Sequence, residues 1–231
     1  MADKLVIVPY NIKKHSTQVK FLIEKYLVPM YLNRMGITEK ERSKYLTIED
    51  CLDPESANNP KFENVSYVAI ESSGRVVACY MNYFLSEQNL QSDLIDHPKA
   101  GMFDFQNPSK LRQFSEHRYE VCHDMVNLYK QYNQETLFYM ETGIVIPEYR
   151  RLGITKLLTN KACQRFGQDY GILWEGMKLV DNDKMSPGLQ PSDEANLGLH
   201  LFGVDGFLPL KRVLSYDNYV VDVLFRPPGP I

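Results

Sequence analysis

The sequence lacks several patterns that would place a chain of 231 residues in a specialised class. Its four cysteines, Cys51, Cys79, Cys122 and Cys163, lie far apart and form no Cys-x-x-Cys pair. Such isolated cysteines provide neither a zinc-binding motif nor a disulfide framework, and they are typical of buried or free thiols in a reducing compartment. We therefore expect no bound metal.

Long apolar runs and blocks of like charge are also missing. No uninterrupted apolar stretch approaches the ~18 residues that a membrane helix needs, and the first residues resemble a short strand more than a signal peptide. The formal net charge is only -3, which does not suggest a nucleic-acid-binding surface. We expect a cytoplasmic protein that binds neither nucleic acid nor membrane. A single domain over residues 1–231 is the default for this length.

The most informative feature that is present is a strand, a turn and a helix in direct succession. The apolar, β-branched stretch 140–146 predicts a strand that the following proline ends. Helical spacing of apolar residues begins at Ile154. Gly153 in the turn lets the backbone approach a ligand closely. The N–H groups of the helix's first turn, together with Arg150 and Arg151, would form a phosphate-binding site.

This turn resembles the acyl-CoA loop of the GCN5-related N-acetyltransferase superfamily, whose pattern is Arg or Gln, two residues, Gly, one residue, then Gly or Ala. Arg150 and Gly153 match, whereas Thr155 replaces the small last residue. The resemblance implies acetyl-CoA as cosubstrate, with the pantetheine arm paired to the strand and Gly143 as a bulge beside it. An ordinary turn with two solvated arginines is the alternative. The residues assigned to acetyl-CoA by the resemblance are Ile144, Val145, Ile146, Arg150, Arg151, Leu152, Gly153, Ile154, Thr155 and Lys156.

The rest of the chain predicts a mixed α/β fold. The segment 53–61 is expected to be an exposed turn region. The order of elements resembles the same superfamily, in which a single domain has a central mixed, mostly antiparallel twisted sheet flanked by helices and splayed at the acyl-CoA-binding strand. Strands are expected over 5–10, 66–71, 75–85, 172–180 and 213–223, and helices after Ser16 or Thr17, over 107–131 and over 193–202.

Two weaker similarities to the superfamily lie elsewhere. Residues 201–207 look like the Leu-Tyr-x-x-x-Gly-Phe end of its last core helix, with Phe202 in place of the tyrosine that serves there as general acid. Residues 26–37 are similar to a stretch of the invertebrate arylalkylamine N-acetyltransferases, although an amphipathic helix end would look the same. Met30 replaces the glutamate that serves as catalytic base in that family. A base would therefore have to come from another residue. The leaving thiolate either takes a proton from another residue, with Tyr170, Tyr216 and Tyr219 as candidates, or leaves unprotonated.

Acyl transfer to an amine needs a base for the amine proton and a donor for the carbonyl oxygen. We consider two candidate bases. Glu141 lies on the expected strand, two residues before Gly143, where a partly desolvated carboxylate can act through water. His200 lies in the expected last helix, and the ordinary pKa of a histidine suits a base near neutrality. A structural role is the alternative for both residues.

These observations favour an acetyl-CoA-dependent N-acetyltransferase that acts on a small primary amine, with an arylalkylamine as the candidate acceptor. Tyrosines and phenylalanines at 26, 31, 80, 83 and 84 are candidates to line an aromatic acceptor pocket, but an aromatic core has the same sequence signature. Two alternatives stay open: acetylation of protein lysines or N-termini, and a non-catalytic acyl-CoA-binding module. The sequence leaves the amine, the acyl length and the oligomeric state open.

Overall fold

The computed structural model describes residues 5–29, 54–90, 125–179, 206–215 and 219–229. Contacts between Cα atoms divide the chain into two compact units. Of the described residues, the first unit contains 5–29, 54–83 and 140–165. The second unit contains 84–90, 125–139, 166–179, 206–215 and 219–229.

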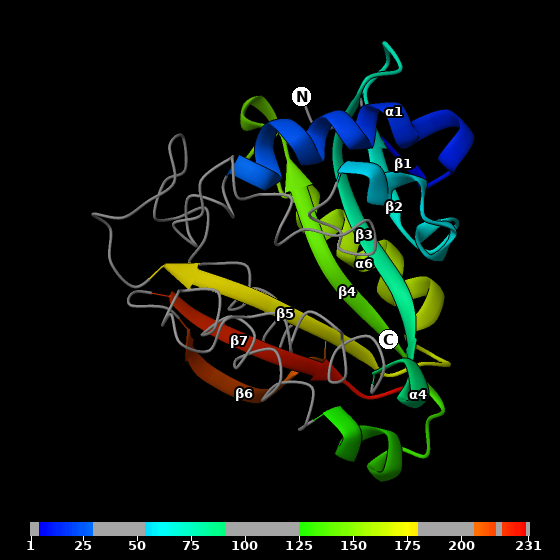
Figure 1. Ribbon diagram of the computed structural model, residues 1–231, viewed down its shortest axis with the longest axis vertical. Coiled ribbons are helices and arrows are strands. Elements are labelled where there is room, and N and C mark those ends of the chain that lie inside the picture. The colour runs from blue at the N-terminus through cyan, green and yellow to red at the C-terminus, as the bar shows by residue number, and fades with distance from the viewer. Residues whose placement is uncertain (1–4, 30–53, 91–124, 180–205, 216–218, 230–231) are drawn as a thin grey trace, which may run out of the picture. The chain divides into compact units, whose positions relative to one another are not determined.

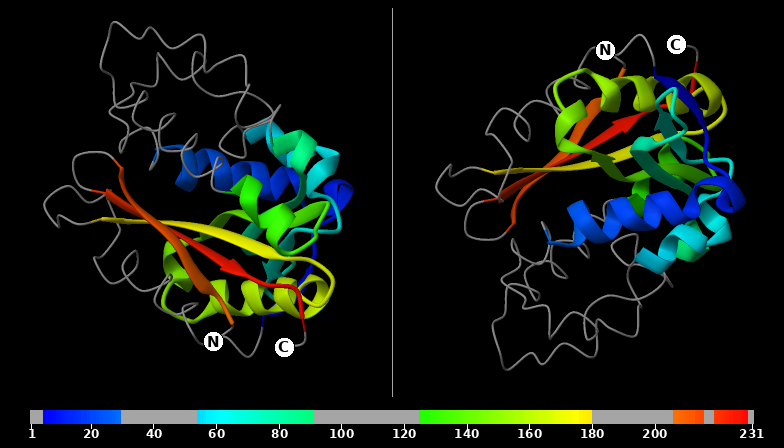
Figure 2. Two further views of the ribbon diagram at one scale, coloured as in Figure 1. Left: turned by 90° about the horizontal axis from the view of Figure 1, so that it is seen from below. Right: turned by 90° about the horizontal axis from the view of Figure 1, so that it is seen from above.

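The first unit is built on antiparallel strands. β1 (Val6–Pro9) pairs with β2 (Tyr67–Ile70), which pairs with β3 (Val76–Ser86). The second half of β4 (Thr136–Val145) also belongs to this unit. Figures 1 and 2 show α1 (Ile12–Leu22) and α6 (Ile154–Phe166) on opposite faces of these strands. Every residue of β3 in this unit is buried, as expected for a strand covered on both faces.

The start of α1 differs from the sequence expectation of a cap at Ser16 or Thr17. Asn11 caps the helix instead, and its side chain accepts a hydrogen bond from the Lys14 N–H at 3.1 Å. The Asn11 side chain also donates to Glu63 Oε1 at 3.2 Å. Because this cap is held by a residue distant in sequence, the helix begins one turn earlier than local hydroxyl residues suggest. A π-helical turn, η2 (Ile23–Leu27), continues the helix.

The segment that precedes β2 is a turn region, as expected, but it is exposed only in part: Glu55, Asn58 and Pro60 are exposed, whereas Pro54, Ser56 and Ala57 are buried. It forms two 3₁₀ turns, η4 (Pro54–Asn58) and η5 (Pro60–Phe62). Ser56 and Ala57 are fully buried, and the Tyr10 hydroxyl donates to the Ala57 carbonyl. Part of η4 is buried because this turn packs against α1.

The second unit contains a three-stranded antiparallel arrangement. β7 (Tyr219–Arg226) lies between β5 (Ile172–Leu179) and β6 (Leu208–Ser215). Two short helical segments, α4 (Glu87–Leu90) and residues 125–131, belong to the same unit. The closing strands extend beyond the expected 213–223, and the expected helix over 193–202 lies outside the described residues.

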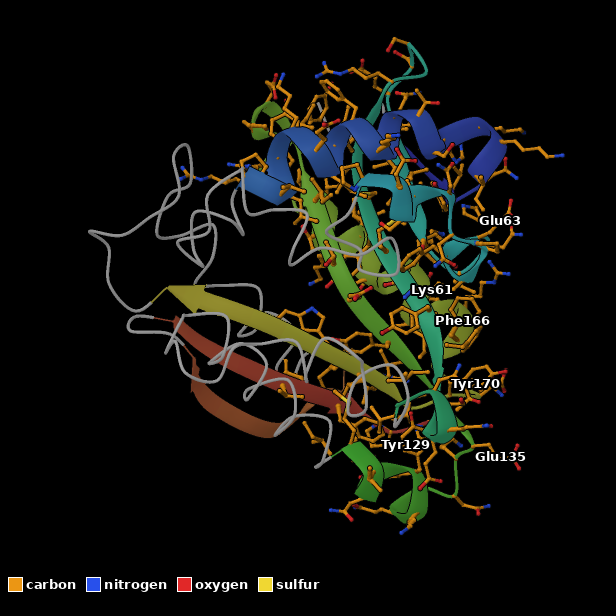
Figure 3. All side chains as sticks on the ribbon, viewed as in Figure 1. Lys61, Glu63, Tyr129, Glu135, Phe166 and Tyr170 are labelled. Atoms are coloured by element: carbon orange, nitrogen blue, oxygen red, sulfur yellow. The ribbon has the colours of Figure 1, made fainter. Side chains whose placement is uncertain are left out.

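Aromatic side chains form the core of the second unit. The Phe84 ring contacts the rings of Phe138, Phe166 and Tyr170, with centroids 5.6, 5.4 and 4.7 Å away (Phe166 and Tyr170 are labelled in Figure 3). Arg226, at the end of β7, is buried, and its guanidinium donates to the Gly167 carbonyl at 2.7 Å. This contact holds the strand end beside the segment that follows α6.

The strand order is β1-β2-β3 within the first unit and β5-β7-β6 within the second. The pairings β1–β2, β2–β3, β5–β7 and β6–β7 are all antiparallel. The expected fold class, a mixed and mostly antiparallel sheet with flanking helices, is confirmed. Among the described residues, no helix has both the length and the apolar character needed to cross a membrane.

Candidate functional site

The candidate site lies where β4 ends, at its arrowhead in Figure 1. The Ile146 N–H donates to the Val77 carbonyl at 3.0 Å, which ties the end of the strand to β3. A 3₁₀ turn, η8 (Pro147–Tyr149), follows directly. The expected strand end at Pro147 is therefore confirmed, and the chain leaves the sheet at this proline because proline has no N–H for a strand pairing.

Two residues in the next turn have a left-handed backbone. Arg151 has a φ of 64° and Gly153 a φ of 73°. The left-handed conformation costs a non-glycine residue about 1–2 kcal/mol. Asn64 and Asn133 are the other described non-glycine residues with positive φ, and asparagine tolerates this region better than arginine does. A strained arginine held by its surroundings points to a functional turn.

Backbone N–H groups are presented at the start of α6. The N–H groups of Tyr149 and Arg150 bond back to Ile146 and Pro147, whereas that of Leu157 bonds to the Gly153 carbonyl at 3.1 Å. Residues 151–153 form the turn between these bonds, and residues 154–156 begin the first turn of the helix. The first N–H groups of a helix have no partner within it, and the helix dipole adds positive potential there. We call residues 150–156 the anion turn.

Side chains of the anion turn differ in exposure. Arg150 folds back, and its Nε donates to the Val145 carbonyl at 3.2 Å. This bond places the guanidinium against the end of β4, whereas Arg151 extends from the exposed tip of the turn. Of the residues expected to bind acetyl-CoA, Ile144, Ile146 and Ile154 are buried, Val145, Arg150, Thr155 and Lys156 are half-buried, and Arg151, Leu152 and Gly153 are exposed.

Gly143 is required by packing. A Cβ atom at this position would lie 2.9 Å from Cε2 of Tyr80, which is closer than real side chains approach. The Tyr80 ring therefore covers β4 at the glycine. This contact gives a reason for Gly143 that the sequence did not suggest, and the expected bulge beside it stays a prediction.

Of the two candidate bases, the structure describes one. Glu141 lies on β4 between the buried residues Met140 and Thr142. Its side chain is half-buried, and its Oε2 atom is shielded from solvent. A carboxylate at such a depth has the partial desolvation expected of a base that acts through water. His200 lies outside the described residues, as do Phe202 and Met30.

Of the aromatic side chains considered for an acceptor pocket, Tyr80, Tyr83 and Phe84 serve packing. Tyr83 is 5% exposed, and its ring meets Phe62 edge-on with centroids 5.9 Å apart. The ammonium of Lys61, which is labelled in Figure 3, lies 4.3 Å from the centre of the Tyr83 ring. Tyr80 covers Gly143, and Phe84 belongs to the aromatic core of the second unit. Core packing therefore accounts for these three side chains.

One group of polar residues near the anion turn has no sequence signal. The Tyr149 hydroxyl donates to the carboxylate of Glu71, a residue 78 positions earlier in the chain. The Ser73 hydroxyl donates to the other carboxylate oxygen at 2.6 Å. Hydrogen bonds from Ser73 and Tyr149 lower the pKa of Glu71, and the bond to Glu71 raises the pKa of Tyr149. Only the folded chain brings these residues together.

Metal chemistry finds no support in the described part of the chain. Within those residues, no group of three or more His, Cys, Asp and Glu side chains gathers in a way that could hold a metal ion. Cys79 and Cys163 are both buried free thiols. Burial raises the pKa of the Cys79 thiol to about 12, so this cysteine is inert as a nucleophile near neutrality.

Sequence comparison finds no matching family model and no matching curated protein. Solved structures do match over nearly the whole chain. A polyamine N-acetyltransferase from Drosophila melanogaster, which catalyses the formation of N-acetylagmatine, has a TM-score of 0.64 at 13% identity, with 96% of this chain and 98% of that chain covered. Arylalkylamine N-acetyltransferase 2 from Aedes aegypti has a TM-score of 0.57 at 13% identity, with 96% and 98% covered.

A mosquito arylalkylamine N-acetyltransferase-like protein, 5b, has a TM-score of 0.60 at 10% identity, with 96% of this chain and 99% of that chain covered. These similarities show that the chain has the N-acetyltransferase fold. The fold expected from the sequence is therefore confirmed.

Proposed function

We propose that this protein is an acetyl-CoA-dependent N-acetyltransferase that acetylates a small primary amine. The observation that carries the proposal is the anion turn, in which a strained Arg151 and a left-handed Gly153 lead from β4 into α6. The same pattern, Arg150 to Thr155, carries the sequence resemblance to the acyl-CoA loop. A fold alone does not fix an activity, so the argument rests on this turn.

The anion turn suits the pyrophosphate of CoA for two reasons. α6 is thirteen residues long, so its N-terminus has a developed dipole and several N–H groups directed away from the helix. The exposed Arg151 adds a charged donor, and an arginine bonds phosphate with two parallel hydrogen bonds. The pantetheine arm would extend from there along Ile146, Val145 and Ile144 of the strand.

The reaction follows from the residues of β4. The amine nitrogen attacks the thioester carbonyl, a C–N bond forms, and the C–S bond breaks. The amine proton passes to Glu141 directly or through water, and we keep His200 as the alternative base. The Ile146 N–H already bonds to the Val77 carbonyl, so a backbone N–H of Ile144 or Val145 would stabilise the negative carbonyl oxygen. The CoA sulfur can leave as a thiolate, so a phenylalanine at 202 does not prevent the reaction.

The acceptor class is inferred from the structural neighbours. A polyamine and an arylalkylamine N-acetyltransferase both have this fold, which supports a small amine as the acceptor. An arylalkylamine is our first candidate because residues 26–37 are similar to that family. We further propose that both units belong to one cytoplasmic catalytic domain over residues 1–231.

A binding and turnover experiment tests the function. The purified protein is titrated with acetyl-CoA by calorimetry, and thiol release is then followed with agmatine, polyamines, arylalkylamines and lysine or N-terminal peptides. We expect acetyl-CoA to bind, raising the melting temperature by mass action, and thiol to be released with a small amine. Release with peptides alone would favour a protein acetyltransferase, and binding without release would favour an acyl-CoA-binding module. Absence of binding would refute the proposal.

A further inference from the structure

The hairpin between β2 and β3 contacts the residue that immediately precedes the anion turn. Tyr149 donates its hydroxyl hydrogen to Glu71, at the start of the hairpin. Ser73, inside the hairpin, donates to the same carboxylate and accepts the Arg75 N–H at 3.3 Å. We call Glu71, Ser73 and Tyr149 the hairpin clamp. Its bonds use an ionised acceptor, which makes them stronger than bonds between neutral groups.

The hairpin itself is fixed from its other side. The Gln18 side chain on α1 donates to the Gly74 carbonyl at 3.2 Å and accepts the Val76 N–H at 2.7 Å. A single side chain thus spans the tip of the hairpin and the first residue of β3. The clamp is therefore anchored to a helix, and Tyr149 bonds to a fixed carboxylate.

Other contacts between the hairpin and η8 are weaker. The Arg75 guanidinium lies 4.0 Å from the Glu148 carboxylate, and both side chains are at least half exposed. Such exposed pairs contribute little. The bond between Ile146 and Val77 fixes the end of β4, three residues before Tyr149. The Tyr149–Glu71 bond thus joins the hairpin directly to the segment that enters the anion turn, and its acceptor is charged.

The anion turn needs contacts that hold its backbone in place. Arg151, two residues after Tyr149, has a left-handed backbone that relaxes unless the surrounding structure holds it. We propose that the hairpin clamp holds the entry to the anion turn and thereby sets the affinity for the CoA pyrophosphate, with Tyr149 and Glu71 as positioning residues. This inference rests on the proposed function.

The test compares two acyl donors. Acetyl-CoA has the pyrophosphate, and acetylpantetheine lacks it. We expect Tyr149→Phe to raise the KM for acetyl-CoA about three- to tenfold, the effect of one hydrogen bond. The amine KM, kcat at saturating acetyl-CoA, and kcat/KM for acetylpantetheine should stay unchanged. Glu71→Ala should match this loss, whereas Glu71→Gln, which keeps an acceptor oxygen, should recover part of it.

A double variant makes the coupling measurable. If the two residues act as one clamp, Tyr149→Phe with Glu71→Ala should lose no more affinity than either change alone. Tyr132→Phe, which removes a tyrosine hydroxyl in the second unit, serves as the control. The clamp would be overturned if the affinity losses of the two single variants added in the double variant, or if kcat/KM for acetylpantetheine fell as much as that for acetyl-CoA. The proposed function would stand in both cases. If the unmodified protein binds no acetyl-CoA, both proposals fall.

Discussion

Replacing Gly153 with alanine tests the contribution of the backbone of the anion turn to acetyl-CoA binding, apart from the contribution of its side chains. The φ of this residue is 73°, and a Cβ atom built there would meet no other atom within 4 Å. The cost of Gly153→Ala therefore comes from the left-handed backbone alone, about 1–2 kcal/mol. For a chain of this length, each 1 kcal/mol lowers the melting temperature by roughly 2–4 °C.

Gly206 provides a matched control for this substitution. Its φ is 76°, and the nearest atom to a built Cβ is Arg226 Nε at 3.6 Å, an ordinary contact. Gly206→Ala should therefore cost about the same stability, again roughly 1–2 kcal/mol. Gly153→Asn should cost less than Gly153→Ala because asparagine tolerates the left-handed region.

Binding distinguishes the two glycines. Gly153→Ala should redirect the N–H groups at the start of α6, and loss of one bond to a charged phosphate, about 1.5–3 kcal/mol, lowers affinity roughly ten- to hundredfold. Gly206→Ala should leave acetyl-CoA affinity intact. Calorimetric scanning with and without acetyl-CoA measures both effects. If Gly153→Ala lowers the melting temperature but binds acetyl-CoA like the unmodified protein, the anion turn is not the CoA site and the reasoning fails.

Three further predictions concern side chains. Arg151→Gly and Arg151→Ala should weaken acetyl-CoA binding equally in calorimetry, although only the glycine variant relieves the left-handed strain; unchanged affinity in both would leave the backbone as the sole anion site. Glu141→Gln should lower kcat/KM for the amine about a hundred- to ten-thousand-fold and change the acidic limb of the pH–rate profile, with acetyl-CoA affinity intact. If His200→Asn shows that loss and Glu141→Gln does not, the base is His200. His15 accepts the Asn11 N–H at 3.0 Å, and its pKa is lowered from 6.5, mainly by burial and also by Lys14. The stability that neutral His15 contributes is therefore present above pH 6.5 and is lost as the pH falls towards the lowered pKa. His15→Gln should reduce the change of melting temperature with pH over this range.

Local patterns predicted the elements that local chemistry determines. The strand that stops at Pro147, the helix from Ile154 and the turn around Gly74 follow from proline chemistry, apolar spacing and glycine. The turn that joins β4 to α6 was predicted for the same reason, because its pattern is contiguous in sequence, and its binding of acetyl-CoA stays a prediction. Strand β3 was recognised as buried because its first residues form an unbroken apolar run.

Elements held by distant contacts were not predicted. The start of α1 depends on Glu63, 52 residues after Asn11, so local hydroxyl residues gave the wrong cap. The burial of Ser56 and Ala57 depends on Tyr10 and α1. The sequence of that segment is polar and rich in turn residues, which is typical of surface loops. In both cases the stabilising partner lies in an element that periodicity cannot associate with the segment.

The left-handed backbone of Arg151 is a feature that the sequence did not predict. Sequence patterns mark glycine as the residue for a left-handed position, and Gly153 fulfils this role in the anion turn. A glycine at position 151 would supply the same backbone without the cost of about 1–2 kcal/mol. Retaining arginine there is consistent with a use for its guanidinium that a glycine cannot provide. Because Arg150 bonds to the Val145 carbonyl and Arg151 is exposed, the two adjacent arginines differ in role: the first fixes the turn to the strand, and the second presents charge at its tip.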